Sequence, residues 1–296
     1  YEDWGVDGHY LVMNDIDLSG YTAGEGWIPL SGNNYNISFG GSVQGNGFSI
    51  QNLTISRTGD YQGLFGYIRE TAVLENIGLT DVSISISDLL QGYTAGLAAY
   101  NYHGRIVNCI VSGTVSGGDY TGGLIGNAST ATIANCVSTA TVTGVNNVGG
   151  LIGNFNTGTL TACHATGDVT GNNTVGGLAG YCLAVVTECS ASGAVSGADY
   201  TGGLIGSIQT GELSQSFATG TVTGTVERTG GLVGLMSSLT VSNCYAAGNV
   251  SGLVNAGGLA GGNSSGTIEQ SYATGAVSGQ SNVGGLAGFN SNGTVT

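Results

Sequence analysis

Apolar residues and glycines recur along the chain at one spacing. A short phrase, GGLIG, GGLAG or GGLVG, returns throughout the chain, with the variants QGLFG and AGLAA as its first two copies. Its leucine lies at nine positions: Leu64, Leu97, Leu124, Leu151, Leu178, Leu204, Leu232, Leu259 and Leu286. After a first step of 33 residues, the steps between them are 27, 27, 27, 26, 28, 27 and 27 residues. So regular a period predicts a solenoid, in which each repeat buries its apolar face against its neighbours.

Two of the later steps depart from 27 residues. The missing residue lies between Leu178 and Cys189, and the extra one lies in TGTVERTGG at 223–231. Both stretches are polar or rich in glycine, so we expect turns to absorb the change without moving a core position.

A second segment of each unit alternates between small or apolar residues and hydroxyl residues. In CVSTATVTG at 136–144 and CHATGDVTG at 163–171, cysteine, small residues and valine share one face, while threonine or serine recurs on the other. This period of two predicts a strand with one buried face. A further apolar position lies three residues before the cysteine position: Ile106, Ile133, Leu160, Val186, Leu213, Val241 and Ile268.

Three short apolar stretches per unit predict a coil of short strands, with parallel copies stacked about 4.8 Å apart. The expected fold is all-β, a right-handed parallel β-helix of about nine coils, with the handedness taken from the rule for parallel crossovers. We expect residues 1–60 to form an N-terminal cap with the first strands, and 61–296 to form the repeats, with an incomplete last coil. A continuing chain or an end-to-end copy is expected to cover the open edge of that coil.

Composition and charge narrow the function classes. Glycine supplies 57 of the 296 residues, and we interpret these glycines as residues with positive φ at corners, or at places too narrow for a side chain. The formal charge is −14, with four arginines and no lysine. A surface so poor in cations excludes nucleic acid as a partner. No apolar run approaches the roughly 20 residues that membrane insertion requires.

The repeated phrases resemble those of bacterial GLUG-motif repeat proteins. The resemblance rests on the GGLIG, GGLAG and GGLVG phrases, each followed by a turn and then by segments such as SYATGAVSG at 271–279. It extends to YLVMNDIDLSGY at 10–21 and FGGSVQGNGFSIQNLTI at 39–55, which look like the segment that opens such solenoids. Gln44 and Phe48 depart from the aspartate and histidine usual in that opening segment.

The resemblance implies a β-solenoid of a secreted or surface-attached protein. Repeats of this kind occur in adhesins, in secreted peptidases and beside carbohydrate-active modules. We therefore expect a non-enzymatic adhesive or spacer module, extracellular or on the cell surface, that binds glycan or a partner protein. A carbohydrate-active domain and a self-assembling filament subunit are the alternatives.

Cysteines occupy one repeat position on several coils: Cys109, Cys136, Cys163, Cys189 and Cys244. Side chains stacked in parallel keep their Cβ atoms about 4.8 Å apart, beyond the usual disulfide range of about 3.5–4.5 Å. The spacing also matches no compact zinc motif. We interpret these cysteines as reduced packing residues, like the leucines of the repeated phrase. Cys182 lies outside the pattern, and its pairing stays open.

Acidic and amide residues share the position five residues before the leucine. This column contains Asp119, Asn146, Asn173, Asp199 and Glu227 on successive coils. Asp199 and Glu227 are expected one rung apart, near the separation of retaining glycosidase carboxylates, with Tyr200 and Arg228 beside them as a sugar-stacking ring and a cation. Calcium is the one cofactor to consider, on Asp119, Asp199 and Glu227. A polar turn, where aspartate and asparagine are common, is the alternative interpretation.

Outward positions offer two more candidates. Phe217, Tyr245 and Tyr272 follow the cysteine position on three successive coils, as a platform for a sugar or partner, or as a stabilising stack. Threonine and serine columns resemble those of ice-binding solenoids. Mixed sizes and a charge in the middle column disfavour that function, since it reads Thr114, Thr141, Asp168, Ala194, Thr221, Asn249 and Ala276.

Overall fold

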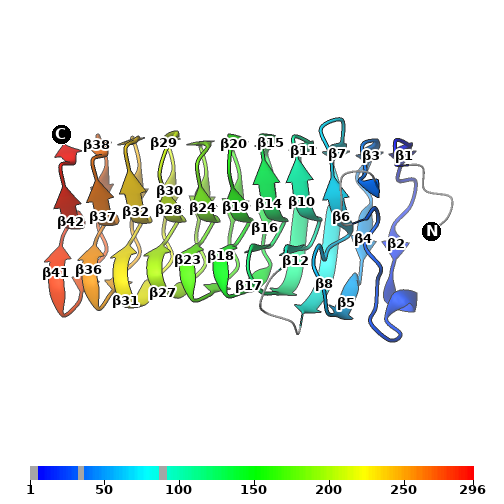
Figure 1. Cartoon of the computed structure of the whole chain (residues 1–296), viewed down its shortest axis with the longest axis horizontal. Helices are drawn as coiled ribbons and strands as arrows, with labels where there is room; N and C mark the ends of the chain where they lie inside the picture. The colour runs from blue at the N-terminus through cyan, green and yellow to red at the C-terminus, as the bar shows by residue number, and fades with distance from the viewer. Residues whose placement is uncertain (1–5, 33–36, 87–91) are drawn as a thin grey trace.

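The strands of this protein stack along one axis. The computed structural model describes residues 6–32, 37–86 and 92–296. In Figure 1 the coils follow one another along an elongated solenoid, with β1 (His9–Leu11) at one end and β42 (Ala287–Ser291) at the other. The named strands all pair in parallel within three sheets, one of them with nine strands, which confirms the predicted all-β parallel solenoid of about nine coils. Within the described residues, the one helical element is a 3-10 turn at Ser19–Tyr21.

Each coil passes through three sheets. The nine-stranded sheet contains β6 (Phe65–Ile68), β10 (Ala98–Tyr102), β14 (Ile125–Ser129), β19 (Ile152–Phe155), β24 (Ala179–Cys182), β28 (Ile205–Ile208), β32 (Val233–Ser237), β37 (Ala260–Ser264) and β42 (Ala287–Ser291). The eleven-stranded sheet contains β1 (His9–Leu11), β3 (Ser42–Gln44), β7 (Val73–Glu75), β11 (Arg105–Val107), β15 (Ala131–Ala134), β20 (Gly158–Thr161), β25 (Val185–Thr187), β29 (Glu212–Ser214), β33 (Thr240–Ser242), β38 (Thr267–Glu269) and β43 (Thr294–Val295).

The third sheet is built from shorter pieces, several per coil, and has 23 strands. Its first half contains β2 (Ile16–Asp17), β4 (Ser49–Gln51), β5 (Thr54–Arg57), β8 (Gly78–Ile86), β9 (Thr94–Ala95), β12 (Ile110–Ser116), β13 (Thr121–Gly122), β16 (Val137–Ser138), β17 (Thr141–Thr143), β18 (Asn146–Gly149), β21 (His164–Ala165), β22 (Val169–Thr170) and β23 (Asn173–Gly176). Its second half contains β26 (Ser190–Ala191), β27 (Val195–Gly202), β30 (Phe217–Ala218), β31 (Val222–Gly230), β34 (Tyr245–Ala246), β35 (Val250–Ser251), β36 (Val254–Gly257), β39 (Tyr272–Ala273), β40 (Val277–Ser278) and β41 (Ser281–Gly284).

The register absorbs both irregular steps where the sequence predicts. Phe155 pairs with Cys182, but Thr159 pairs with Val185, so the residue is lost in the turn after β24. The extra residue forms a bulge between β27 and β31, where the register shifts between Gly197 and Asp199. A bulge leaves the extra residue unpaired, so the apolar columns on either side stay aligned.

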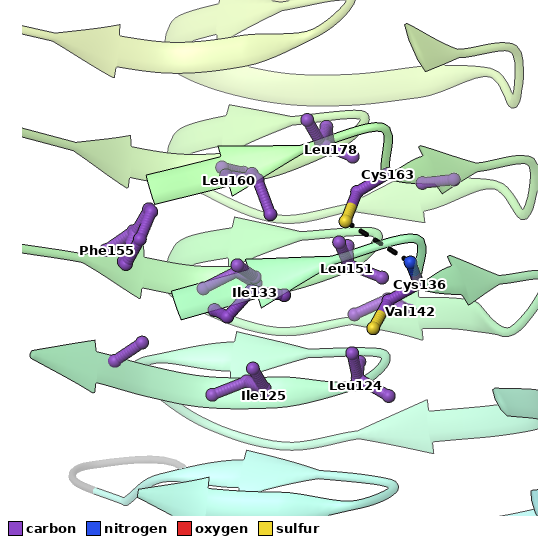
Figure 2. Packing of buried hydrophobic residues seen from close by; sticks show 14 of the residues in the cluster. Leu124, Ile125, Ile133, Cys136, Val142, Leu151, Phe155, Leu160, Cys163 and Leu178 are labelled. Atoms are coloured by element: carbon purple, nitrogen blue, oxygen red, sulfur yellow. Dashed lines mark hydrogen bonds between the residues drawn. The ribbon is translucent and has the colours of Figure 1, made fainter. Parts of the chain in front are cut away.

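The interior is one continuous apolar core. The first eight leucines of the repeated phrase are at most 3% exposed. Figure 2 shows Leu124, Leu151 and Leu178 one above another, with Cys136 and Cys163 in a neighbouring column. Each coil therefore packs mainly on the coils before and after it, as in other solenoids.

The corner before the cysteine position has the left-handed backbone conformation in eight coils. The φ values lie between 48° and 58° at Asn76, Asn108, Asn135, Ala162, Glu188, Gln215, Asn243 and Gln270. Our assignment of positive φ at corners to the glycines is wrong at this corner, because asparagine and other residues occupy it. Asparagine adopts this region more readily than most residues, since its short amide bonds locally.

The glycines of the repeated phrase serve close approach instead. A Cβ atom added at Gly150 would lie 2.1 Å from the carbonyl oxygen of Gly177 on the next coil. The φ angle of Gly150 is not in the left-handed region. Glycine is therefore needed at this position because the space between coils is too narrow for a side chain, as we inferred from the sequence for some of the glycines.

Ala162 offers a test of the corner, because it is the alanine in that left-handed column, with φ 51°. We expect Ala162→Gly to raise the free energy of unfolding by about 1 kcal/mol, since the left-handed conformation penalises a Cβ atom. Ala134→Gly, in the regular strand β15, is the control and is expected to lower stability by about 0.5–1 kcal/mol. Urea unfolding followed by circular dichroism measures both, and a loss of stability in both variants would contradict the strain argument.

Candidate functional site

The polar column before the leucine is continuous in the structure. Register pairs Asn146 with Asn173, Asn173 with Asp199, and Asp199 with Glu227. The Asn146 amide donates to Asp119 Oδ1 at 2.7 Å, and the Asn173 amide donates to Asn146 Oδ1 at 2.9 Å. Asp119 is therefore part of an amide ladder, and two asparagine rungs separate it from Asp199. The three proposed calcium ligands do not lie together.

Four of the candidate residues do form one cluster at the other end of this column. Arg228 donates a hydrogen bond to Glu227 Oε1 and another, at 2.9 Å, to the Tyr200 hydroxyl. Its guanidinium carbon lies 5.1 Å from the centroid of the Tyr200 ring, a cation–π contact. Asp199 lies opposite Glu227, half-buried, with Oδ1 buried and without a hydrogen-bond partner.

The cluster is a polar surface with one cation, Arg228, which its hydrogen bonds to Glu227 and Tyr200 hold in place. Arg228 is the single lysine or arginine in residues 106–296. Its ion pair with Glu227 engages the carboxylate that would act beside Asp199 in hydrolysis. Across the described part of the chain, no group of three His, Cys, Asp or Glu residues is placed to hold a metal ion. Tyr200, Glu227 and Arg228 are each partly exposed, so the cluster offers a ring, a carboxylate and a guanidinium, groups that bind sugar hydroxyls or a polar partner.

The aromatic column is a stack. Phe217 and Tyr245 have ring centroids 4.8 Å apart and planes 3° from parallel, and Tyr245 and Tyr272 follow at 5.4 Å and 9°. Strands β30, β34 and β39 place them in register. Because the rings lie face to face, the column presents mainly ring edges along the solenoid. Tyr272, which is 55% exposed, offers the most accessible ring.

The hydroxyl columns of the 23-stranded sheet do not lie on one unbroken strand. In most coils the strand is interrupted, as between β21 and β22, and Asp168 lies in the interruption. Its Oδ1 accepts a hydrogen bond from the Ala194 amide of the next coil at 2.8 Å. Asn249 does the same for the Ala276 amide at 3.0 Å. The mixed middle column therefore holds coils together.

The cysteine column combines packing with backbone hydrogen bonding. All six cysteines are buried and free. The Cys136 amide donates to the Cys163 sulfur at 3.3 Å, and in two other coils Ser216 and Ser271 hydroxyls accept the same bond at 3.0 Å. This explains why cysteine and serine interchange at this position, which packing alone did not predict. Burial raises the pKa of Cys182 to about 12, so this thiol stays protonated and unreactive.

A cluster of five tyrosines lies on the N-terminal coils, and sequence reasoning missed it. Tyr67 on β6 and Tyr100 on β10 stack with centroids 4.7 Å apart and planes 18° from parallel. Tyr93 and Tyr120 stack at 5.0 Å and 22°, and Tyr61 contacts Tyr67, Tyr93 and Tyr100. Four of the five share two repeat positions, three residues after the leucine and four before it, and that recurrence is the signal in the sequence. Burial, then neighbouring tyrosines, raise the pKa of Tyr67 and of Tyr93 to about 12, so both phenols are neutral at ordinary pH.

An apolar hollow lies at the N-terminal end of the solenoid. It has a volume of about 470 Å³ and lies between the segment 10–18 and the first strands of the core, with Trp27, Leu64 and Phe65 in its lining. Leu11 and Met13, which also line it, are 54% and 62% exposed.

Comparison with known proteins identifies the repeat. Residues 117–143, which form one coil, match the GLUG motif. One coil of this chain therefore carries the GLUG motif. Because the same positions pair in register from coil to coil, the neighbouring coils share the structure of the coil that matches.

Two curated relatives are similar to part of this chain. A provisionally named Gly-rich membrane protein of Evansella cellulosilytica is 42% identical over 81 residues, 26% of this chain and 9% of the relative. Halomucin of Haloquadratum walsbyi is 35% identical over 115 residues, 36% of this chain and 1% of the relative. The chain thus spans less than a tenth of the length of either relative.

A solved structure aligns with most of this chain. The crystal structure of a provisionally named immunoglobulin A1 protease from Bacteroides ovatus covers 97% of this chain and 77% of its own, at 17% identity and a TM-score of 0.40. Within the described residues of this chain, no helix is long and apolar enough to cross a membrane.

Proposed function

We propose that this GLUG solenoid is a non-enzymatic adhesive or spacer module of a secreted or cell-surface protein. The observation that carries the proposal is the unbroken core, in which the leucine column and the column of cysteine or serine continue from coil to coil. A core of that kind makes a stiff rod, and nine coils at about 4.8 Å each span roughly 40 Å. The relative described as a membrane protein supports placement at a cell surface.

Binding would take place on the outer columns, which the stacked coils hold at fixed spacing. The Tyr200–Glu227–Arg228 cluster and the ring of Tyr272 are the sites that we propose for a glycan or a partner protein. An aromatic ring and a few fixed polar groups are the usual elements of sugar recognition. The acidic surface favours neutral or cationic ligands over anionic ones.

We expect Tyr272→Ala and Arg228→Gln each to weaken binding of neutral oligosaccharides, immobilised as an array, by roughly 2- to 10-fold. Tyr181→Ala, on the nine-stranded sheet, is the matched control and should bind as the unchanged chain does. Equal binding by all variants would contradict the assignment of these sites. If the chain binds no glycan on the array, the proposal of glycan binding is wrong and the spacer role stands without it.

The carbohydrate-active alternative rests on the register that places Asp199 opposite Glu227. Release of reducing ends from the same oligosaccharides distinguishes it from binding. We expect none. If the original chain releases reducing ends and both Asp199→Asn and Glu227→Gln abolish that release, the adhesive proposal is wrong and the domain is an enzyme.

A further inference from the structure

We propose that the stacked tyrosines on successive coils are sites of oxidative cross-linking, at which a haem peroxidase with hydrogen peroxide forms dityrosine bonds. The first site is Tyr67 with Tyr100, and the second is Tyr93 with Tyr120. Each bond would join one coil covalently to the next. The proposal is independent of which ligand the outer columns bind.

The geometry favours coupling between neighbours in one molecule. Tyr67 and Tyr100 are register partners on adjacent parallel strands, β6 and β10, which lie side by side in Figure 1. Their rings are nearly parallel at 4.7 Å, so ring carbons of one phenol lie over those of the other. Fixing two reactants in this way replaces a bimolecular encounter with an intramolecular step. Both rings are half-buried, so each keeps an accessible edge for electron transfer to an external oxidant.

The reaction balances with peroxide as the oxidant. Two phenols each give up one electron and one proton. One hydrogen peroxide molecule accepts the two electrons and the two protons and becomes two water molecules. The two phenoxyl radicals join through a carbon–carbon bond between the carbons ortho to each oxygen. Each coupled ring then returns its ortho hydrogen to its own oxygen as a proton, which restores the aromatic phenol. The protein loses two hydrogen atoms for each bond.

Cross-links of this kind would compensate for a weakness of the solenoid. Each coil is held mainly by its neighbours, and the buried free cysteines stack without forming disulfides in this structure. The two tyrosine sites connect three consecutive coils near the N-terminal end, through β6, β10 and the corners that precede β9 and β13. The column on the C-terminal coils supplies a third pair, Tyr245 with Tyr272, at 5.4 Å and 9°.

The four arginines make the test direct, because trypsin cuts the chain after each of them. Fragment 58–69 carries Tyr67, and fragment 70–105 carries both Tyr93 and Tyr100. Fragment 106–228 carries Tyr120. After treatment of the dilute folded chain with peroxidase and limiting peroxide, mass spectrometry is expected to find 58–69 joined to 70–105, and 70–105 joined to 106–228. The intact chain should stay monomeric and lose two hydrogen masses per bond.

Phenylalanine variants keep the ring packing and remove the phenol. Tyr67→Phe should abolish the first junction and Tyr120→Phe the second, each without affecting the other. Tyr61→Phe is the control for the first junction, since Tyr61 lies in the same fragment but is tilted 40° to Tyr93 and 51° to Tyr100. The chain also contains an internal control, because Phe217 stacks most nearly parallel on Tyr245 but has no phenol to oxidise.

Three results would overturn the proposal. One is coupling only between molecules, and another is a first junction that persists in Tyr67→Phe. The third is the same pattern of bonds in the chain unfolded in guanidinium, because the solenoid would then play no part in choosing the pairs. Thermal unfolding of the cross-linked chain at a higher temperature than the untreated chain is the expected consequence of joining coils.

Discussion

Gly150→Ala is expected to lower the free energy of unfolding by about 3 kcal/mol or more, at the upper end of overpacking effects. The added Cβ atom would lie 2.1 Å from the carbonyl oxygen of Gly177, which is backbone of the next coil and cannot rotate away. The two coils would have to separate there, which would weaken the ladder of the hydrogen bonds around them. Urea unfolding followed by far-ultraviolet circular dichroism measures the effect.

The chain contains a matched control for this change. Gly285 occupies the same repeat position on the last coil, and a Cβ atom added there meets nothing within 4 Å. We expect Gly285→Ala to change stability by no more than about 0.5 kcal/mol, as at an ordinary surface site. Equal losses in the two variants would show that glycine matters here for a reason other than contact between coils.

Leu151→Ala is expected to cost about 2–5 kcal/mol, the usual range for truncating a fully buried leucine. Leu151 is 0% exposed and lies between Leu124 and Leu178 in the same column, so its loss leaves a cavity that both neighbouring coils line. Denaturant unfolding is again the measurement, with the slope of the transition recorded to detect partial unfolding of coils.

The same substitution at Leu286 is the control, because that leucine is only partly buried against the core. We expect it to cost less than half as much as Leu151→Ala, since little cavity forms where one side is already open. A larger loss at Leu286 than at Leu151 would contradict a core in which each coil depends on both neighbours.

Most of the fold could be predicted from the sequence, because a parallel stack keeps each repeat position in one column. The 27-residue period and the alternation after the cysteine position indicate the parallel solenoid, its core columns and the turns that absorb the two irregular steps. The same logic placed Asp199 opposite Glu227 and put Phe217, Tyr245 and Tyr272 in one column. Spacing along the chain is sufficient for such neighbours, since they share a repeat position.

Contacts between different repeat positions required the tertiary structure. Tyr93 lies at the corner before β9 and Tyr100 lies on β10, and the two rings meet because the coil turns between these strands. The 27-residue period does not determine the angle of that turn. The ion pair of Arg228 with Glu227 and its bond to Tyr200 depend on side-chain directions at a left-handed corner, where both Tyr200 and Arg228 have positive φ. The sequence by itself determined which residues stack, because stacking follows the period. The tertiary structure alone decided which columns touch, because that depends on how tightly each coil closes.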